Sequence, residues 1–133
     1  HLSIRRQRQM CIRDSNVADQ DIDIGIGEDN RKRWLKSGKA SFQPEEREWL
    51  QRLGQFGLTD SYRKLHPFSE QYSWFDYRSK GFEREPKRGL RIDQILLTKS
   101  LLKHCKEADI DYVIRAMDKP SDHCPIFVKL ELD

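Results

Sequence analysis

The stretch Gly89–Leu97, GLRIDQILL, decides how the sequence is interpreted, because it places a carboxylate among aliphatic residues. Its apolar residues alternate loosely and then follow one another up to Leu97, which predicts a buried strand. Asp93 lies within this strand. Burying a charge without a partner costs several kcal/mol, so we expect Asp93 to have a specific partner.

Helical and extended patterns flank this strand. The clearest helix is predicted over Pro44–Phe56, because proline suits the first helical turn and the apolar residues recur at helical spacing. Its expected apolar stripe consists of Trp49, Leu50, Leu53 and Phe56. Further helices are expected over Glu28–Lys36, Thr59–Leu65 and Thr98–Lys106, and strands over Tyr72–Tyr77, Ile110–Arg115 and Pro125–Leu130. This mixture predicts an α/β (α+β) fold class.

The composition limits the size of the core and the meaning of the charge. Hydrophobic residues make up 36% and charged residues 35% of 133 residues, whereas ordinary domains hold about 45–50% and 25%. The net charge of +3 arises in residues 1–15, which contain four arginines and one aspartate, so that residues 16–133 sum to zero. Overall basicity therefore does not indicate nucleic-acid binding.

The first 15 residues, HLSIRRQRQMCIRDS, show no periodicity and differ in composition from the rest of the chain. We expect residues 1–15 to be a non-native or disordered leader, followed by domain sequence over 16–133. Three widely spaced cysteines, at positions 11, 105 and 124, favour reduced thiols and a cytoplasmic location. No apolar run reaches the roughly 18 residues of a membrane-spanning helix, so we expect no membrane association.

Polar side chains that could take part in catalysis occur at three places. Besides Asp93, Asp122 and His123 occupy a Ser-Asp-His turn before the last predicted strand, and Asp14 and Asn16 are two residues apart. Carboxylates can hold a hard divalent cation, and a histidine oriented by an aspartate can move a proton. The set is typical of metal-assisted phosphate ester hydrolysis. The alternative is structural: an ordinary turn histidine and an aspartate that caps a loop.

Four long strings carry a family resemblance. They are DIDIGIGEDNRKRWLKSGKASFQPEEREWL from Asp21, YSWFDYRSKGF from Tyr72, RGLRIDQILL from Arg88 and IDYVIRAMDKPSDHCPIF from Ile110. From Asn16 to Leu130 the chain resembles the exonuclease III family, whose members are about twice as long. The resemblance implies that residues 16–133 are the C-terminal half of a four-layer αββα sandwich of the endonuclease/exonuclease/phosphatase type.

The resemblance also implies an activity. It is hydrolysis of DNA phosphodiesters with Mg²⁺ or Mn²⁺, as a 3′→5′ exonuclease on double-stranded DNA and as an endonuclease at abasic sites. The partners would be double-stranded and abasic-site DNA, and the full-length form would be a monomer. Of the catalytic set, Asp14 and Asn16 match a Gly-Asp-x-Asn motif in which Arg13 replaces glycine, while Asp93 would orient His123 at the scissile phosphate. Asp122 would help to bind the metal.

Five residues are expected to contact DNA, and the resemblance implies that the aromatic at position 74 enters the duplex beside an abasic site. The five are Trp74, Phe75, Arg78, Lys80 and Arg91. The basic residues cluster near this aromatic loop, and the alternative for them is a solvated loop. The family's N-terminal half, with further metal and catalytic ligands, has no counterpart here, so one alternative is an inactive fragment with at most weak DNA binding. Another is a phosphoesterase of the same fold acting on a lipid phosphoester, although the aromatic and basic string from Tyr72 suits a DNA groove better.

Overall fold

The computed structural model describes residues 11–12, 16–117 and 120–132. The helices are η1 (Asp21–Asp23, a 3-10 helix), α2 (Glu28–Ser37), α3 (Pro44–Gln55), α4 (Ser61–Leu65), α5 (Lys99–Leu102) and α6 (Tyr112–Arg115). The strands are β1 (Cys11–Ile12), β2 (Ile24–Gly25), β3 (Leu58–Asp60), β4 (Gly89–Leu90), β5 (Leu96–Thr98), β6 (Cys105–Ile110) and β7 (Ile126–Leu130). The predicted mixture of helices and strands is confirmed.

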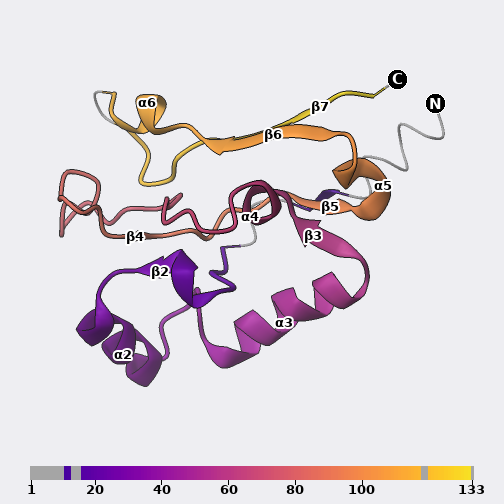
Figure 1. The fold of residues 1–133 in the computed structure, drawn as a ribbon. Helices are drawn as coiled ribbons and strands as arrows, with labels where there is room; N and C mark the ends of the chain where they lie inside the picture. Colours follow the sequence, from indigo (N-terminus) through magenta and orange to yellow (C-terminus); the bar gives the residue numbers. More distant parts are fainter. Residues whose placement is uncertain (1–10, 13–15, 118–119, 133) are drawn as a thin grey trace.

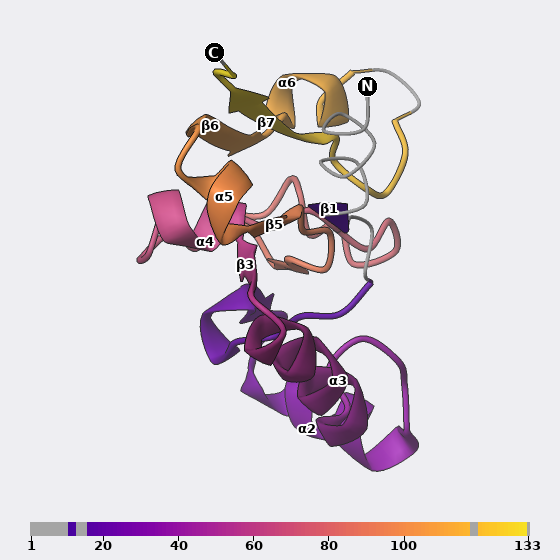
Figure 2. The same ribbon diagram turned by 90° about the vertical axis from the view of Figure 1, so that its right-hand side faces the viewer.

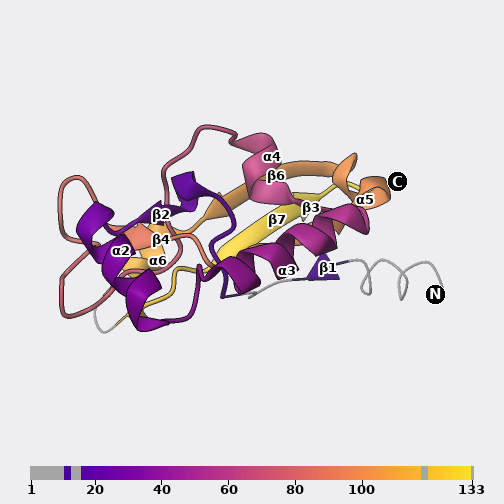
Figure 3. The ribbon, with the colours of Figure 1, turned by 90° about the horizontal axis from the view of Figure 1, so that it is seen from below.

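The elements are stacked in tiers (Figure 1). Helices α2 and α3 lie on one side, the hairpin β6–β7 lies on the other, and the short strands β2 to β5 fill the space between, as the turned view also shows (Figure 2). Seen from below, α2 and α3 lie in front of the strands (Figure 3). The described strands pair antiparallel in the orders β1-β5-β3, β2-β4 and β6-β7.

Helix α3 forms where the sequence predicted it. Pro44 occupies the first turn, and the Glu46 carboxylate accepts a hydrogen bond of 3.1 Å from the Gln43 amide in a capping box. The predicted apolar stripe is wrong in part, because Trp49 and Phe56 are exposed, Phe56 by 85%. Only Leu50 is buried, in a cluster with Val17 and Leu96 to which the partly buried Leu53 adds. The helix thus uses a narrow part of its apolar face.

Strand predictions late in the chain were right only in part. Strand β7 is confirmed, and its alternate side chains Ile126 and Val128 turn inward while Phe127 is exposed. The predicted strand Ile110–Arg115 is wrong: β6 already ends at Ile110, and the Asp111 carboxylate accepts from the Ile114 amide to start α6. An aspartate N-cap overrode the β propensity of the apolar residues that come after it.

The stretch Gly89–Leu97 is not one strand but two. Strands β4 and β5 are separated by residues 91–95, which lie outside any named strand. The backbone there bonds to more distant partners; for example, the Arg91 amide donates to the Asp23 carbonyl at 2.9 Å. This interruption turns the Arg91 and Asp93 side chains toward partners far away in the sequence.

The core is divided among several clusters. One joins Tyr62, Tyr72 and Phe75 to residues of β6, and another joins Phe42 and Leu90 near α2. No helix among the described residues is long and apolar enough to cross a membrane. The predicted leader lies outside the described residues except at positions 11–12, which form β1 and pair with β5. The leader therefore stays a prediction.

Candidate active site

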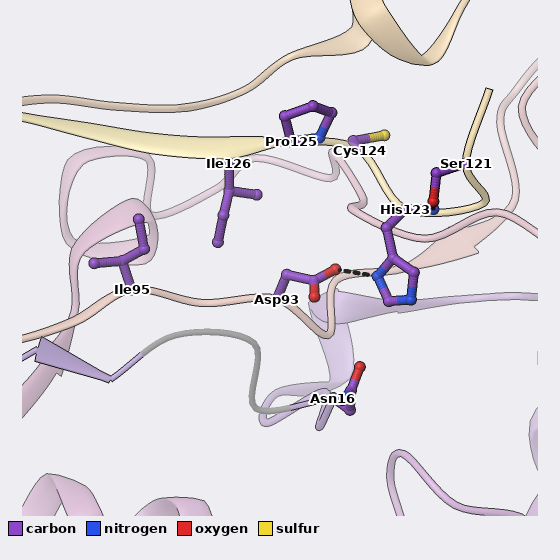
Figure 4. A pocket seen from close by; sticks show the side chains of 8 residues that line it. All are labelled: Asn16, Asp93, Ile95, Ser121, His123, Cys124, Pro125 and Ile126. Atoms are coloured by element: carbon purple, nitrogen blue, oxygen red, sulfur yellow. Dashed lines mark hydrogen bonds and ion pairs between the residues drawn. The ribbon is translucent and has the colours of Figure 1, made fainter.

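Asp93 has the partner that its position in the sequence demanded. Its Oδ2 lies 2.8 Å from Nδ1 of His123 (Figure 4). The Asp93 side chain is only 6% exposed, whereas the His123 side chain is 38% exposed. Since an ionised carboxylate only accepts hydrogen bonds, Nδ1 must carry the proton in this pair. The buried aspartate therefore fixes the imidazole with Nε2 as its second, available nitrogen.

The pair lies on the wall of an open cavity of about 590 Å³. Its lining consists of Asn16, Asp93, Ile95, Ser121, His123, Cys124, Pro125 and Ile126. In Figure 4 the second ring nitrogen of His123 points away from Asp93, and Asn16 faces the pair from the other side. The cavity thus combines an oriented imidazole with a carboxamide that can donate hydrogen bonds, a combination that suits a phosphate oxygen.

Asn16 lines this cavity and has an unusual backbone conformation. Its φ of 57° lies in the left-handed region, which asparagine tolerates better than most residues. The cavity therefore brings together Asn16, Asp93 and His123 of the predicted catalytic set. The fourth member, Asp14, lies outside the described residues.

Asp122 makes a hydrogen bond that the sequence did not predict. Its Oδ2 accepts a hydrogen bond of 3.0 Å from the indole Nε1 of Trp74. Across residues 11–12, 16–117 and 120–132, no group of three or more histidine, cysteine or acidic side chains is placed to hold a metal ion. Because Mg²⁺ requires near-octahedral oxygen coordination, the described residues do not by themselves fit a metal site.

A second cavity of about 740 Å³ lies beside Trp74. Its apolar lining is Ile26, Trp34 and Trp74, and its charged lining is Arg33, Lys39, Asp76, Arg78, Arg84 and Arg88. Trp34 and Trp74 meet edge to face, with ring centroids 6.0 Å apart. Aromatic faces beside several guanidinium groups are typical of surfaces that hold a nucleic-acid strand. Of the predicted DNA contacts, Trp74 and Arg78 line this cavity, and Lys80 is exposed.

Two predicted DNA contacts must be corrected. Phe75 is 0% exposed and packs in the core against Tyr72 and Phe82. Arg91 is 1% exposed, and its guanidinium is held by the carboxylates of Asp23 and Asp60. Neither side chain can reach DNA without unfolding its surroundings, so both residues are structural. Their aromatic and basic neighbours on the surface made them resemble DNA contacts in the sequence.

One residue that contributes to the site has no signal in the sequence. Ser73 is 0% exposed, and its hydroxyl accepts hydrogen bonds from the amides of Ile92 and Asp93 at 3.0 and 3.1 Å. Serine is common in loops, so nothing in its neighbourhood Tyr72–Phe75 distinguished it. Only the fold brings it next to the Asp93 backbone.

Comparison with known sequences finds similar DNA nucleases. No family model matches the chain. Exodeoxyribonuclease III of Haemophilus influenzae is 56% identical over 119 residues, which are 89% of this chain and 44% of that protein. An exodeoxyribonuclease of Bacillus subtilis is 35% identical over 114 residues. These residues are 85% of this chain and 40% of that protein. The chain thus spans less than half the length of these curated relatives.

Solved structures that resemble this chain are also enzymes that act on DNA. A 3′-5′ exonuclease of Neisseria meningitidis superimposes with a TM-score of 0.78 at 34% identity, covering 98% of this chain and 49% of the neighbour. An AP endonuclease of Archaeoglobus fulgidus superimposes with a TM-score of 0.76 at 31% identity. The match covers 90% of this chain and 44% of the endonuclease chain. A Neisseria enzyme described as a 3′ phosphatase bound to a product DNA hairpin gives 0.79 at 33% identity. These neighbours confirm the expected nuclease-type fold class.

Proposed function

Because the chain is a partial-length relative of the exonuclease III-type nucleases, we propose that it supplies the His123–Asp93 part of a DNA phosphodiesterase site. The parent activity would be 3′→5′ exonuclease action on double-stranded DNA and incision at abasic sites. The full-length enzyme would act as a cytoplasmic monomer. The observation that carries this proposal is the buried carboxylate 2.8 Å from an accessible imidazole on a cavity wall.

The proposed chemistry is set by the orientation of the imidazole. With Nδ1–H donated to Asp93, Nε2 of His123 can accept a proton from an attacking water. Once protonated, the same nitrogen can donate to a phosphate oxygen and offset its growing negative charge, while the buried Asp93 carboxylate stabilises the imidazolium. Asn16 would orient the phosphate from the opposite wall of the cavity.

The second cavity would hold the DNA strand next to this site. Trp74 connects the two places, because its backbone bridges to His123 while its side chain lines the second cavity. The guanidinium groups of Arg78, Arg84 and Arg88 would bind backbone phosphates there. A Neisseria neighbour bound to a DNA hairpin supports DNA as the substrate class. We propose double-stranded and abasic-site DNA as partners of the full-length enzyme.

The proposed cofactor, Mg²⁺ or Mn²⁺, needs ligands beyond those that the structure describes. A divalent cation at this site would neutralise charge on the phosphate. Asp122 could offer one carboxylate oxygen, but its Oδ2 is already bonded to Trp74. We therefore expect further oxygen ligands from outside the described residues.

A chimera tests the proposed function. This chain would replace the matched part of the Haemophilus relative, to which it is 56% identical, and nicking of an abasic-site duplex would be measured with Mg²⁺. We expect the chimera to be active, the His123→Ala chimera to lose activity by about 10³-fold or more and to keep its DNA affinity, and the chain alone to be inactive. Activity of His123→Ala equal to that of the parent would overturn the proposal.

A matched control comes from the same chain. His104 is partly exposed in a turn and lines neither the His123 cavity nor the Trp74 cavity, so His104→Ala should leave nicking unchanged. A duplex with a 3′-phosphate would serve as a second substrate, because one Neisseria neighbour is described as a 3′ phosphatase. Cleavage of the 3′-phosphate without nicking would replace the proposed nuclease by a phosphatase that uses the same His123–Asp93 pair.

A further inference from the structure

The backbone that carries Asp93 lacks the support of a regular strand. Strand β4 ends at Leu90 and β5 begins at Leu96, so the amides of Ile92 and Asp93 lie between two strands. Both residues are buried, and a buried amide without an acceptor costs about 1–3 kcal/mol. Each of these amides therefore needs an acceptor from elsewhere in the fold.

Ser73 supplies this acceptor to both amides at once. Its Oγ accepts from the Ile92 amide at 3.0 Å and from the Asp93 amide at 3.1 Å, and it lies 3.5 Å from the Leu90 carbonyl oxygen, to which it donates. A hydroxyl group has one donor and two acceptor lone pairs, so these contacts use its full capacity. Because Ser73 is completely buried, water cannot take over these bonds.

The same residue also holds the turn that carries the histidine. The Ser73 carbonyl oxygen accepts a hydrogen bond of 2.6 Å from the Cys124 amide, next to His123. The next residue, Trp74, continues this link, since its backbone bridges to both Leu90 and His123. Residues 73–74 thus tie the two members of the catalytic pair together, although Asp93 and His123 are 30 positions apart.

We propose that Ser73 is a positioning residue, whose hydroxyl fixes the Asp93 backbone so that the carboxylate meets Nδ1 of His123. This inference rests on the proposed function, in which that contact sets the tautomer of the imidazole. Ser73 touches neither water nor substrate and acts only through Asp93. Removing its hydroxyl takes away the acceptor that the Ile92 and Asp93 amides share, so the segment 91–95 shifts and Asp93 no longer holds His123 in one tautomer.

The test measures the tautomer directly on the 133-residue chain labelled with ¹⁵N. Ring nitrogen shifts distinguish an Nδ1–H from an Nε2–H imidazole, and a proton shared with a carboxylate gives a far-downfield ¹H signal. For the unaltered chain we expect the Nδ1–H form of His123 with that signal. In Ser73→Ala we expect the signal to disappear and the ring nitrogens to shift toward a mixture of tautomers.

Two further variants separate positioning from general loss of stability. Ser61 is also buried, and its hydroxyl donates to the Ile95 carbonyl at 2.7 Å without contacting Asp93, so Ser61→Ala should keep the His123 signal. Ser73→Thr keeps the hydroxyl group, so this variant should show the downfield His123 signal that Ser73→Ala loses. Loss of the signal in Ser61→Ala, or its retention in Ser73→Ala, would overturn the positioning role.

A measurement on the unaltered chain guards against a Ser73→Ala variant that does not fold. If the Ser73 hydroxyl is the acceptor, the amides of Ile92 and Asp93 exchange slowly with deuterium, and exchange at the rate of exposed amides would refute the inference. Failure of the proposed function gives a different result. In that case the unaltered chain itself lacks the Nδ1–H form, or the active chimera tolerates His123→Ala, whatever Ser73 does.

Discussion

Replacing Arg91 with alanine should destabilise the fold rather than remove a contact with DNA. The guanidinium Nε lies 2.7 Å from Oδ1 of Asp23, whose side chain is fully buried, and Nη1 lies 3.1 Å from Oδ1 of Asp60. Burial alone lowers the pKa of Arg91, but the carboxylates of Asp60 and Asp23 raise it above its ordinary value. Arg91 therefore remains charged at any moderate pH and pairs with both carboxylates.

The expected magnitude depends on the charges that the variant leaves behind. Removing one partner of a buried ion pair costs about 3–5 kcal/mol, because the other charge stays buried without compensation. Arg63 still contacts Asp23, and the Asp60 side chain is 20% exposed, so we expect the lower end of this range. Since small domains are stable by about 5–15 kcal/mol, such a loss removes much of the stability of this one.

Urea unfolding, followed by tryptophan fluorescence, measures this loss, and DNA affinity is measured separately below the unfolding transition. The matched control is Arg78→Ala, whose side chain is exposed at the second cavity. It should change stability by no more than about 0.5 kcal/mol while weakening DNA binding. If Arg91→Ala instead kept its stability and lost DNA affinity as Arg78→Ala does, the assignment of Arg91 to the core would be wrong.

Three more predictions concern single side chains. Burial raises the pKa of Cys124 to about 12, so iodoacetamide at about pH 8 should modify this thiol only after unfolding; equal rates in both states would contradict its burial. Burial, and then the charge of Asp23, raise the pKa of Asp19, so its ionised form destabilises the fold above that raised pKa. Asp19→Asn should therefore raise the urea midpoint at about pH 7 and hardly change it below about pH 4, and a larger gain in acid would contradict this. Trp74→Phe keeps an aromatic ring but removes the indole N–H bonded to Asp122, so we expect a loss of about 1 kcal/mol in thermal unfolding, and no loss would show that the bond contributes nothing.

The sequence predicted those elements whose pattern is local. Helix α3 has its proline, its capping glutamate and its apolar spacing within Pro44–Gln55, and β7 has its alternation within five residues. The apolar stripe of α3 was overestimated, because the helical pattern shows which side chains share a face but not how wide a surface covers that face. Trp49 and Phe56 are exposed for this reason.

The interruption between β4 and β5 could not be predicted from the stretch Gly89–Leu97 itself. The amides of residues 91–93 are satisfied by the Asp23 carbonyl and the Ser73 hydroxyl, which lie 68 and about 20 positions away along the chain. A local pattern of apolar residues cannot contain such partners. The same limit applies to Phe75, whose aromatic neighbours include Tyr112 from the distant helix α6.

Arg91 and Asp93 show what can be predicted from a charged residue within an apolar stretch of sequence. They stand two residues apart and both are buried. The sequence correctly demanded a partner for Asp93, whereas it wrongly predicted Arg91 to contact DNA. Their functions differ because their partners differ. The partners of Arg91 are carboxylates that are themselves buried or partly buried, so these ion pairs stabilise the fold and do not reach a ligand. The partner of Asp93 is an imidazole that is 38% exposed on a cavity wall, so the charge acts on whatever enters that cavity. The exposure of the partner, which only the fold determines, separates the structural ion pairs of Arg91 from the pair that we propose to be catalytic.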